Sequence, residues 1–359
     1  MPENRDPGMS KLGVLTFHRC VNYGAYWQAR CLLEHLRELG HEAELLDHFS
    51  SRSIWAEWPR LMRPTRPAPR FDVVRSINKI LKFLAAQHRL ARTRTFAPRR
   101  PPRCEEFDSI IVGSDEVWNI GHPWYGNEPL FFGEGLNPRR LISYAPSFGN
   151  YHVDGGLPDE WAGRLRRFHR ISVRDRHSAR IVRETLRIEP AVVLDPCLQF
   201  SPKSFQTPPA SGEAGFLLIY AMQLDPPFVH QVRTWARQRR LKIVSVGYRH
   251  MWADVSLPSA GPEEFLRCFQ GARAVVTSFF HGCVFALKFK RPFVAQVPDY
   301  RANKVNGLLA MAGATERFIR MGESFDARLL DDPLAAAVTA RIEERRRVSS
   351  EFLAEALVA

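Results

Sequence analysis

The sequence predicts an α/β protein with two Rossmann-like domains that face each other across a cleft. Two observations support this prediction. Short apolar runs alternate with helical segments along most of the chain, and this alternation is typical of parallel sheets. The length of 359 residues also fits two domains better than one.

The first half of the chain carries this alternation clearly. Residues 11–17 are predicted as a buried strand, and a helix over 25–39 ends at Gly40, a residue suited to a helix C-terminus. A strand over 43–46 follows. After an interruption, the next elements are a strand over 109–112, a strand over 141–144, a helix over 159–168, a strand over 171–173, a helix over 176–187 and a strand over 191–194.

The second half repeats the pattern after a break in the alternation. Residues 201–214 are rich in proline, serine and glycine, so they are the best candidate for a domain linker. The domains are therefore predicted at 10–200 and 215–330, followed by a C-terminal helix over 333–357. Their second set of elements comprises strands over 216–221, 242–246, 273–277 and 293–296 and helices over 227–239, 262–271, 282–289 and 302–312.

Positive charge is concentrated in one insert of the first domain. Residues 52–104 hold 14 arginines and lysines and two acids, whereas the rest of the chain holds 37 basic and 36 acidic residues. Prolines exclude a long helix over 58–70, but 71–94 is predicted as a basic amphipathic helix. The apolar residues on one side of that helix are Val74, Ile77, Leu81, Leu84 and Leu90.

This insert has two interpretations. It is a solvated loop, or it contacts an anionic membrane surface or an acceptor linked to a lipid diphosphate. Nucleic-acid binding is not expected, because a nucleic-acid groove needs basic residues and stacking aromatic rings on the folded body.

The six cysteines are scattered and form no CxxC pair. A disulfide scaffold or a zinc site would cluster them, so reduced thiols in a cytoplasmic protein are expected, with no metal site. The first ten residues lack the apolar core of a secretory signal, and no apolar run is long enough to span a membrane.

Small or charged residues follow several predicted strands, where open parallel sheets bind ligands. Asn22 and Gly24 form either a tight turn or the anion-binding start of a helix. Ser114 and Asp115 either cap a helix or line a site. The Asp195-Pro196 pair is interpreted as a turn.

Three further residues have both a structural and a functional interpretation. His281 follows a buried strand and is either a core histidine or a general acid. A protonated His281 at a helix start needs a nearby anion, which a phosphorylated substrate would supply. Arg174, at the end of a strand, and Lys304, at the start of a helix, are either solvated cations or anion-binding residues.

Taken together, the ordered motifs are more specific than any one of them. The chain carries NYGAxxQA, IVGSDxVWN, ISYAxSFG, ISVRDxxS, VLDP and TSFFHG in that order, followed by a helix that begins with KxxxLL. This series resembles the polysaccharide pyruvyl transferase family. The resemblance covers about 11–312, apart from the insert.

The resemblance implies a fold similar to the GT-B glycosyltransferases. It also implies phosphoenolpyruvate as donor, with no further cofactor, and a sugar hydroxyl pair on a bacterial polysaccharide or polyprenyl-diphosphate-linked oligosaccharide as acceptor. It places the catalytic histidine at His281 and donor-binding cations at Arg174 and Lys304. The other residues expected to bind substrate are Asn22, Gly24, Ser114, Ser147 and Gly282.

One position departs from the family pattern. Some members carry an acidic residue in the first glycine turn, where this chain has Ala25. Asp115 is therefore the candidate base for the acceptor. Two other functions stay open from the sequence: a GT-B glycosyltransferase that uses a nucleotide sugar, and a non-catalytic relative that binds glycan.

Overall fold

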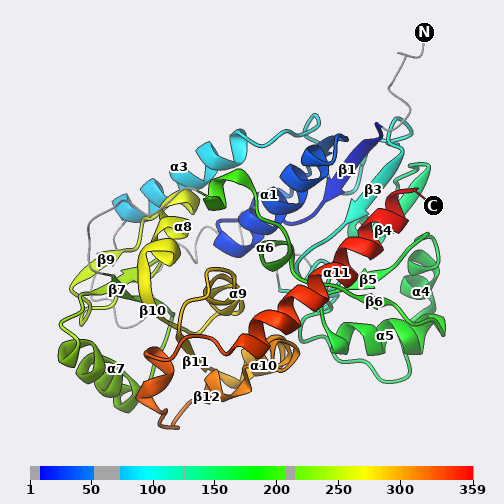
Figure 1. Cartoon of the computed structure of the whole chain (residues 1–359). Coiled ribbons are helices and arrows are strands. Elements are labelled where there is room, and N and C mark those ends of the chain that lie inside the picture. Colours follow the sequence, from blue (N-terminus) through cyan, green and yellow to red (C-terminus); the bar gives the residue numbers. More distant parts are fainter. Residues whose placement is uncertain (1–8, 52–72, 124–125, 207–214, 359) are drawn as a thin grey trace. The chain divides into compact units, whose positions relative to one another are not determined.

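The computed structural model describes residues 9–51, 73–123, 126–206 and 215–358. The chain divides into two compact units. Unit 1 comprises 1–56, 87–202 and 345–359, and unit 2 comprises 57–86 and 203–344. The proline-rich segment 58–70 and the linker residues 207–214 lie outside the described residues (grey in Figure 1).

Unit 1 is built on a four-stranded parallel sheet in the order β2-β1-β3-β4. Strand β1 lies between β2 and β3, and its Leu12 pairs with Ala43 of β2 and with Ser109 of β3. Two further strands, β5 and β6, form a separate parallel pair. The strand bounds are β1 Lys11–Leu15, β2 Glu42–Leu45, β3 Ser109–Val112, β4 Arg140–Ser143, β5 Ser172–Val173 and β6 Ala191–Val192.

Side-chain caps define where the two main helices of unit 1 begin. The Asn22 side chain accepts the amide protons of Gly24 and Ala25, and the Asp175 side chain accepts that of Ser178. The helices of unit 1 are α1 Tyr23–Glu38, α4 Asp159–Leu165, α5 Arg176–Leu186, α6 Pro196–Gln199, the 3-10 helix η1 Pro129–Phe132 and the end of α11 Ala336–Val358.

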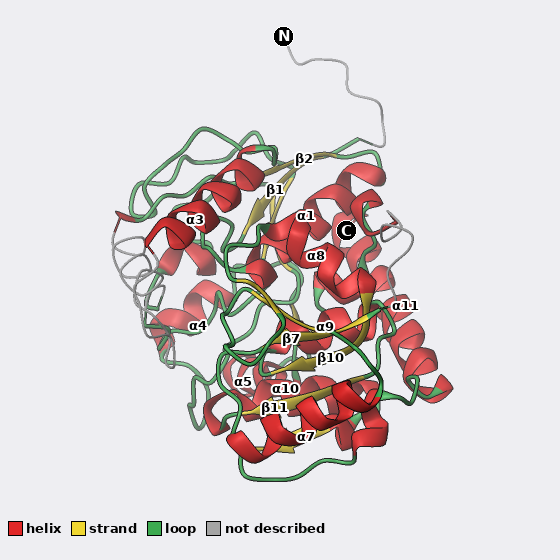
Figure 2. Cartoon of the chain, turned by 90° about the vertical axis from the view of Figure 1, so that its left-hand side faces the viewer, coloured by secondary structure: helices red, strands yellow, loops and turns green. Residues whose placement is uncertain are grey.

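Unit 2 is built on a six-stranded sheet in the order β12-β11-β10-β7-β8-β9, with every pairing parallel. Figure 2 shows β7, β10 and β11 of this sheet side by side. The strand bounds are β7 Phe216–Tyr220, β8 Ile243–Val246, β9 Val255–Leu257, β10 Ala272–Thr277, β11 Phe293–Val297 and β12 Phe318–Arg320. The helices of unit 2 are most of α3 Val73–His88, α7 Pro226–Gln238, α8 Pro262–Gly271, α9 Phe280–Lys288, α10 Asp299–Ala312, the start of α11, and the 3-10 helices η2 Lys203–Gln206, η3 Thr315–Arg317 and η4 Ala327–Leu330.

These two parallel sheets confirm the predicted α/β class with two Rossmann-like halves. The make-up of the units differs from the simple division expected from the sequence. Residues 73–86 of the predicted insert group with unit 2, and the end of the C-terminal helix, 345–358, groups with unit 1.

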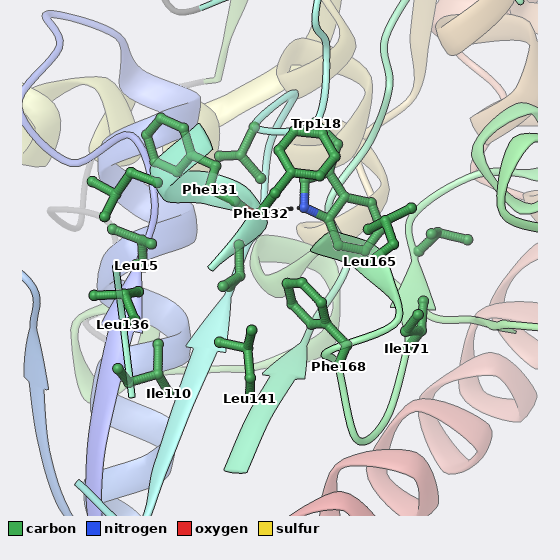
Figure 3. Packing of buried hydrophobic residues seen from close by; sticks show 14 of the residues in the cluster. Leu15, Ile110, Trp118, Phe131, Phe132, Leu136, Leu141, Leu165, Phe168 and Ile171 are labelled. Carbon is green, nitrogen blue, oxygen red and sulfur yellow. Dashed lines mark hydrogen bonds between the residues drawn. The ribbon is translucent and has the colours of Figure 1, made fainter. Parts of the chain in front are cut away.

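An aromatic core in unit 1 fixes the loop that follows β3. Trp118, which belongs to the IVGSDxVWN motif, is fully buried and packs on Phe132 and Phe168 (Figure 3). It also packs on Phe148. Its indole N–H donates a 2.9 Å hydrogen bond to the Phe131 carbonyl. Burying a large side chain of this kind stabilises the fold by about 1.5–3 kcal/mol. The motif tryptophan therefore anchors the polar residues that precede it.

All six cysteines are buried free thiols. Burial raises the pKa of Cys104 and of Cys268 to about 12, so neither thiol is reactive at neutral pH. Within the described ranges, no helix combines the length and the hydropathy required to cross a membrane.

Candidate active site

The carboxyl ends of the unit 1 strands bring polar residues together. Ser114 follows β3, Ala145 follows β4 and Arg174 follows β5. The Ser114 hydroxyl donates to the Ala145 carbonyl at 3.0 Å, and the Arg174 amide donates to the Pro146 carbonyl at 3.1 Å. The loops after three strands are thus joined at the edge where parallel sheets bind ligands.

At this edge the Arg174 guanidinium lies between two carboxylates. Its Nη1 is 3.3 Å from Oδ2 of Asp195 and 3.7 Å from Oδ1 of Asp115, and its side chain is only 5% exposed. Burial lowers the pKa of Arg174, but the charges of Asp115 and Asp195 outweigh burial and raise it. Arg174 therefore stays charged, and carboxylates of the protein itself match that charge.

Gln28 of α1 completes this buried network. Its Nε2 donates to Oδ2 of Asp195 at 2.5 Å and to the Ser114 hydroxyl at 2.9 Å, and the side chain is fully buried. Asp195 also accepts the Cys197 amide proton at 2.9 Å, which begins α6. Asp195 is therefore both a helix cap and a partner of Arg174.

Asp115 is the carboxylate of this cluster that reaches solvent. Its side chain is 17% exposed, compared with 1% for Asp195. Its backbone has φ of 78°, and the neighbouring Ala145 has φ of 54°. Residues other than glycine rarely adopt this region, at a cost of about 1–3 kcal/mol, and they do so most often at functional sites. The local fold holds Asp115 in a strained conformation at the ligand edge.

The glycine before this pair is required by close packing. Gly113 has φ of 120°, and a Cβ atom there would overlap the Tyr144 carbonyl oxygen. A side chain would therefore push apart the loops after β3 and β4.

Replacing Gln28 with methionine tests the network. We expect Gln28→Met to lower the free energy of unfolding by roughly 1–3 kcal/mol, because it removes a donor to a buried carboxylate while keeping the volume. Denaturant unfolding measures the change. Gln238→Met, at the exposed end of α7, is the matched control and should change little. Equal stability of the two variants would contradict a structural role for the Gln28 amide.

The other unit 1 residues predicted to bind substrate have partners within the protein. Asn22 Oδ1 accepts the Gly24 amide proton at 2.8 Å, so this turn caps its own helix. The Ser147 hydroxyl donates to Oδ2 of Asp175 at 2.6 Å and accepts the Gly149 amide proton at 2.9 Å. These contacts hold the ligand edge in shape, and a role in binding substrate stays a prediction.

In unit 2, His281 lies in the first turn of α9, at the carboxyl end of β10. It is half-buried. The next residue, Gly282, packs so closely that a Cβ atom would overlap Oγ1 of Thr277. That hydroxyl also donates to the Tyr220 carbonyl at 2.7 Å. Gly282 thus lets the helix that carries His281 sit directly on the strand ends.

A methyl group at position 282 should therefore be costly. We expect Gly282→Ala to lower the free energy of unfolding by about 1–3 kcal/mol through overpacking against Thr277. Gly307→Ala is the control, since a Cβ atom at that exposed position of α10 would have nothing within 4 Å. That change should be neutral or stabilising by up to about 1 kcal/mol, because alanine favours helix. The urea midpoint should fall for Gly282→Ala and stay the same or rise for Gly307→Ala, and a harmless Gly282→Ala would contradict the tight packing.

Arg301, in the first turn of α10, lies against the turn that precedes His281. Its guanidinium carbon is 4.4 Å from the ring centre of Phe279 and 4.8 Å from that of Tyr300, and its Nη1 donates to the Ser278 carbonyl at 3.4 Å. Aromatic rings hold a guanidinium well in this way. Within the described part of the chain, Arg301 makes no ion pair with a carboxylate. Its charge is therefore available to an anion.

Lys304 lies three residues further along α10 and is half-buried. The helices α9 and α10 pack against each other, so the elements that carry His281 and Lys304 are neighbours in unit 2.

Three residues of these networks are not predicted as site residues from the sequence. Gln28 was quoted only as part of a motif, although it is the one amide on a helix face that is otherwise lined by apolar and aromatic residues. Asp195 was interpreted as a turn residue, and Arg301 was not considered. A signal for Arg301 exists in the sequence, because it lies in the first turn of a helix that follows a buried strand.

Comparison with known families gives one match over most of the chain. A family model described as Polysaccharide pyruvyl transferase matches residues 22–299. The range includes Asp115, Arg174 and His281, whereas Arg301 and Lys304 lie beyond its end. None of the curated protein sequences matches this chain.

Solved structures with similar backbones cover nearly the whole chain at low sequence identity. The glycotransferase of kitacinnamycin matches with a TM-score of 0.46 and 14% identity over 97% of this chain and 96% of its own. Arabidopsis thaliana UGT89C1 complexed with UDP-L-rhamnose matches with a TM-score of 0.48 and 11% identity over 97% and 98%. The glycosyltransferase SnogD from Streptomyces nogalater matches with a TM-score of 0.42 and 14% identity over 96% of each chain.

Proposed function

Because this chain belongs to the polysaccharide pyruvyl transferase family, we propose that it transfers pyruvyl from phosphoenolpyruvate to a pair of sugar hydroxyls. The product is a cyclic ketal on a bacterial polysaccharide precursor. We further propose that the acceptor is an oligosaccharide linked to a polyprenyl diphosphate, and that the reaction takes place in the cytoplasm at the inner face of the plasma membrane.

The observation that carries this proposal is the position of Asp115. Arg174 holds Asp115, a partly exposed carboxylate, at the ligand edge of a parallel sheet, and the buried Asp195 in turn holds Arg174. An ionised carboxylate held in one orientation at this edge can take a proton from a sugar hydroxyl. It also supplies the acidic group that Ala25 does not provide in the first glycine turn.

The sequence predicted Arg174 as a donor-binding residue, and we now assign it a different role. Two carboxylates already match its charge, so a dianionic phosphate would have to compete with both. Arg174 instead positions Asp115. We assign the phosphate and carboxylate of phosphoenolpyruvate to Arg301 and Lys304, since Arg301 presents an uncompensated guanidinium beside the turn that carries His281.

The proposed reaction begins with proton transfer to carbon. Protonated His281 donates its proton to the methylene carbon of phosphoenolpyruvate, which leaves a positive centre at C2. The first sugar hydroxyl attacks C2 while Asp115 takes its proton. The second hydroxyl oxygen then bonds to C2 as the C–O bond to phosphate breaks. Its proton returns to His281, and the proton on Asp115 leaves with the phosphate.

An assay with purified protein separates this function from its rivals. The protein is mixed with a lipid-linked oligosaccharide fraction and either phosphoenolpyruvate or a nucleotide sugar. We expect inorganic phosphate only with phosphoenolpyruvate, and a glycan whose mass has grown by pyruvate less water. Release of UDP or GDP would instead identify a glycosyltransferase, and glycan binding without turnover would identify a non-catalytic relative.

A further inference from the structure

Helix α3 is attached to unit 2 by one face. The side chains of Ile80 and Phe83, both on α3, are buried. Lys82 of α3 forms an ion pair with Glu264 of α8 at 2.7 Å. Lys79 donates to the Gly247 carbonyl at 3.3 Å and lies 5.6 Å from the ring centre of Tyr248. Figure 1 shows α3 lying beside α8. The helix is therefore held in a fixed orientation.

A second apolar face of α3 is left in solvent. Four aliphatic side chains at helical spacing are strongly exposed, which we call the α3 stripe: Val74 at 69%, Ile77 at 44%, Leu81 at 56% and Leu84 at 44%. The sequence pattern had marked these residues as the apolar side of the helix, yet the packing uses Ile80 and Phe83 instead. A contiguous exposed aliphatic stripe of this kind marks an interaction surface.

The sequence of α3 and of the segment that follows it carries charge of one sign. Between Val73 and Cys104 the chain holds nine arginines and lysines and no acidic residue. The side chains of Arg75 and Lys82 on α3 are exposed, and Glu264 already neutralises Lys82. An aliphatic face on a helix without acids, followed by a basic segment, is the pattern of helices that lie in the interface of anionic membranes.

From this combination we infer that the α3 stripe docks on an anionic lipid surface, with Val74, Ile77, Leu81 and Leu84 entering the boundary between headgroups and acyl chains. A second copy of the chain is a poorer occupant, because two such helices would bring like charges together. The inference concerns a surface and does not depend on the chemistry proposed for the active site.

Vesicle flotation of the full chain tests this docking. We expect the wild type to float with vesicles rich in phosphatidylglycerol and not with pure phosphatidylcholine. Ile77→Ser/Leu81→Ser should weaken binding at least about tenfold. Added salt should weaken the vesicle binding of the wild type without abolishing it, because salt screens the charges but not the apolar contact. Since both residues are exposed, the thermal midpoint should stay the same.

A matched control carries the same change elsewhere on unit 2. Met251→Ser/Val255→Ser alters two residues that are 61% and 41% exposed, and it should bind vesicles like the wild type. Equal binding by the Ile77/Leu81 variant, or equal binding to neutral vesicles, would overturn the inference. So would a wild-type dimer in light scattering that the Ile77/Leu81 variant converts to monomer with vesicle binding intact, because the stripe would then be an interface between copies.

Discussion

Replacing Arg174 with methionine should lower the free energy of unfolding by about 3–5 kcal/mol, because it leaves the Asp195 carboxylate buried without its cation. Chemical denaturation at neutral pH measures the loss. The deficit should shrink as the pH falls, since protonation removes the buried negative charge. The free energy of unfolding of Arg174→Lys should lie between those of the wild type and Arg174→Met, because lysine keeps the charge but loses the planar guanidinium.

Arg183→Met provides the matched control. Arg183 pairs with Glu189 at 2.5 Å on the exposed end of α5, so it has a carboxylate partner without burial. Exposed pairs contribute little to stability, and this variant should unfold like the wild type. If Arg174→Met and Arg183→Met were equally stable, the buried cluster would not hold Asp115 in place, and the assignment of Asp115 as base would lose its support.

Replacing His281 with alanine should reduce kcat at least about 100-fold, because the reaction loses its proton donor to carbon. Steady-state release of phosphate from phosphoenolpyruvate measures the effect. The variant should fold normally, since His281 is half-buried in the first turn of α9 and Gly282 keeps its packing against Thr277.

His230→Ala is the control, because it removes a histidine of unit 2 that has no proposed role in the reaction. His230 is exposed on α7 of the same unit, and its removal should leave kcat unchanged. A His281→Ala protein with near-normal kcat would remove His281 from the mechanism. Loss of activity with an altered unfolding midpoint would instead trace the defect to the fold.

Periodicity and turn residues were enough to predict most elements. The strand over 109–112 and the helix over 262–271 have the predicted bounds. The strands β9 and β12, of three residues each, were not predicted. In β9, Val255 and Leu257 are well exposed, so the strand lacks a buried face.

The candidate site was predictable only in part. Arg174, Ser114 and Asp115 directly follow strands, so strand prediction placed them at one edge of a sheet. The contact between Gln28 and Asp195 joins residues 167 positions apart, and no local pattern carries that information. The helix at α3 shows the same limit, because periodicity identified an apolar side without deciding which face would pack.

The most direct measurement of the proposed chemistry is the reaction run in heavy water. If phosphoenolpyruvate is protonated at its methylene carbon by an exchangeable group such as His281, the methyl group of the new ketal should carry a single deuterium, and phosphate should appear in equal amount. A product whose methyl group holds no deuterium, or a glycan that grows by a sugar while UDP or GDP is released, would contradict the account.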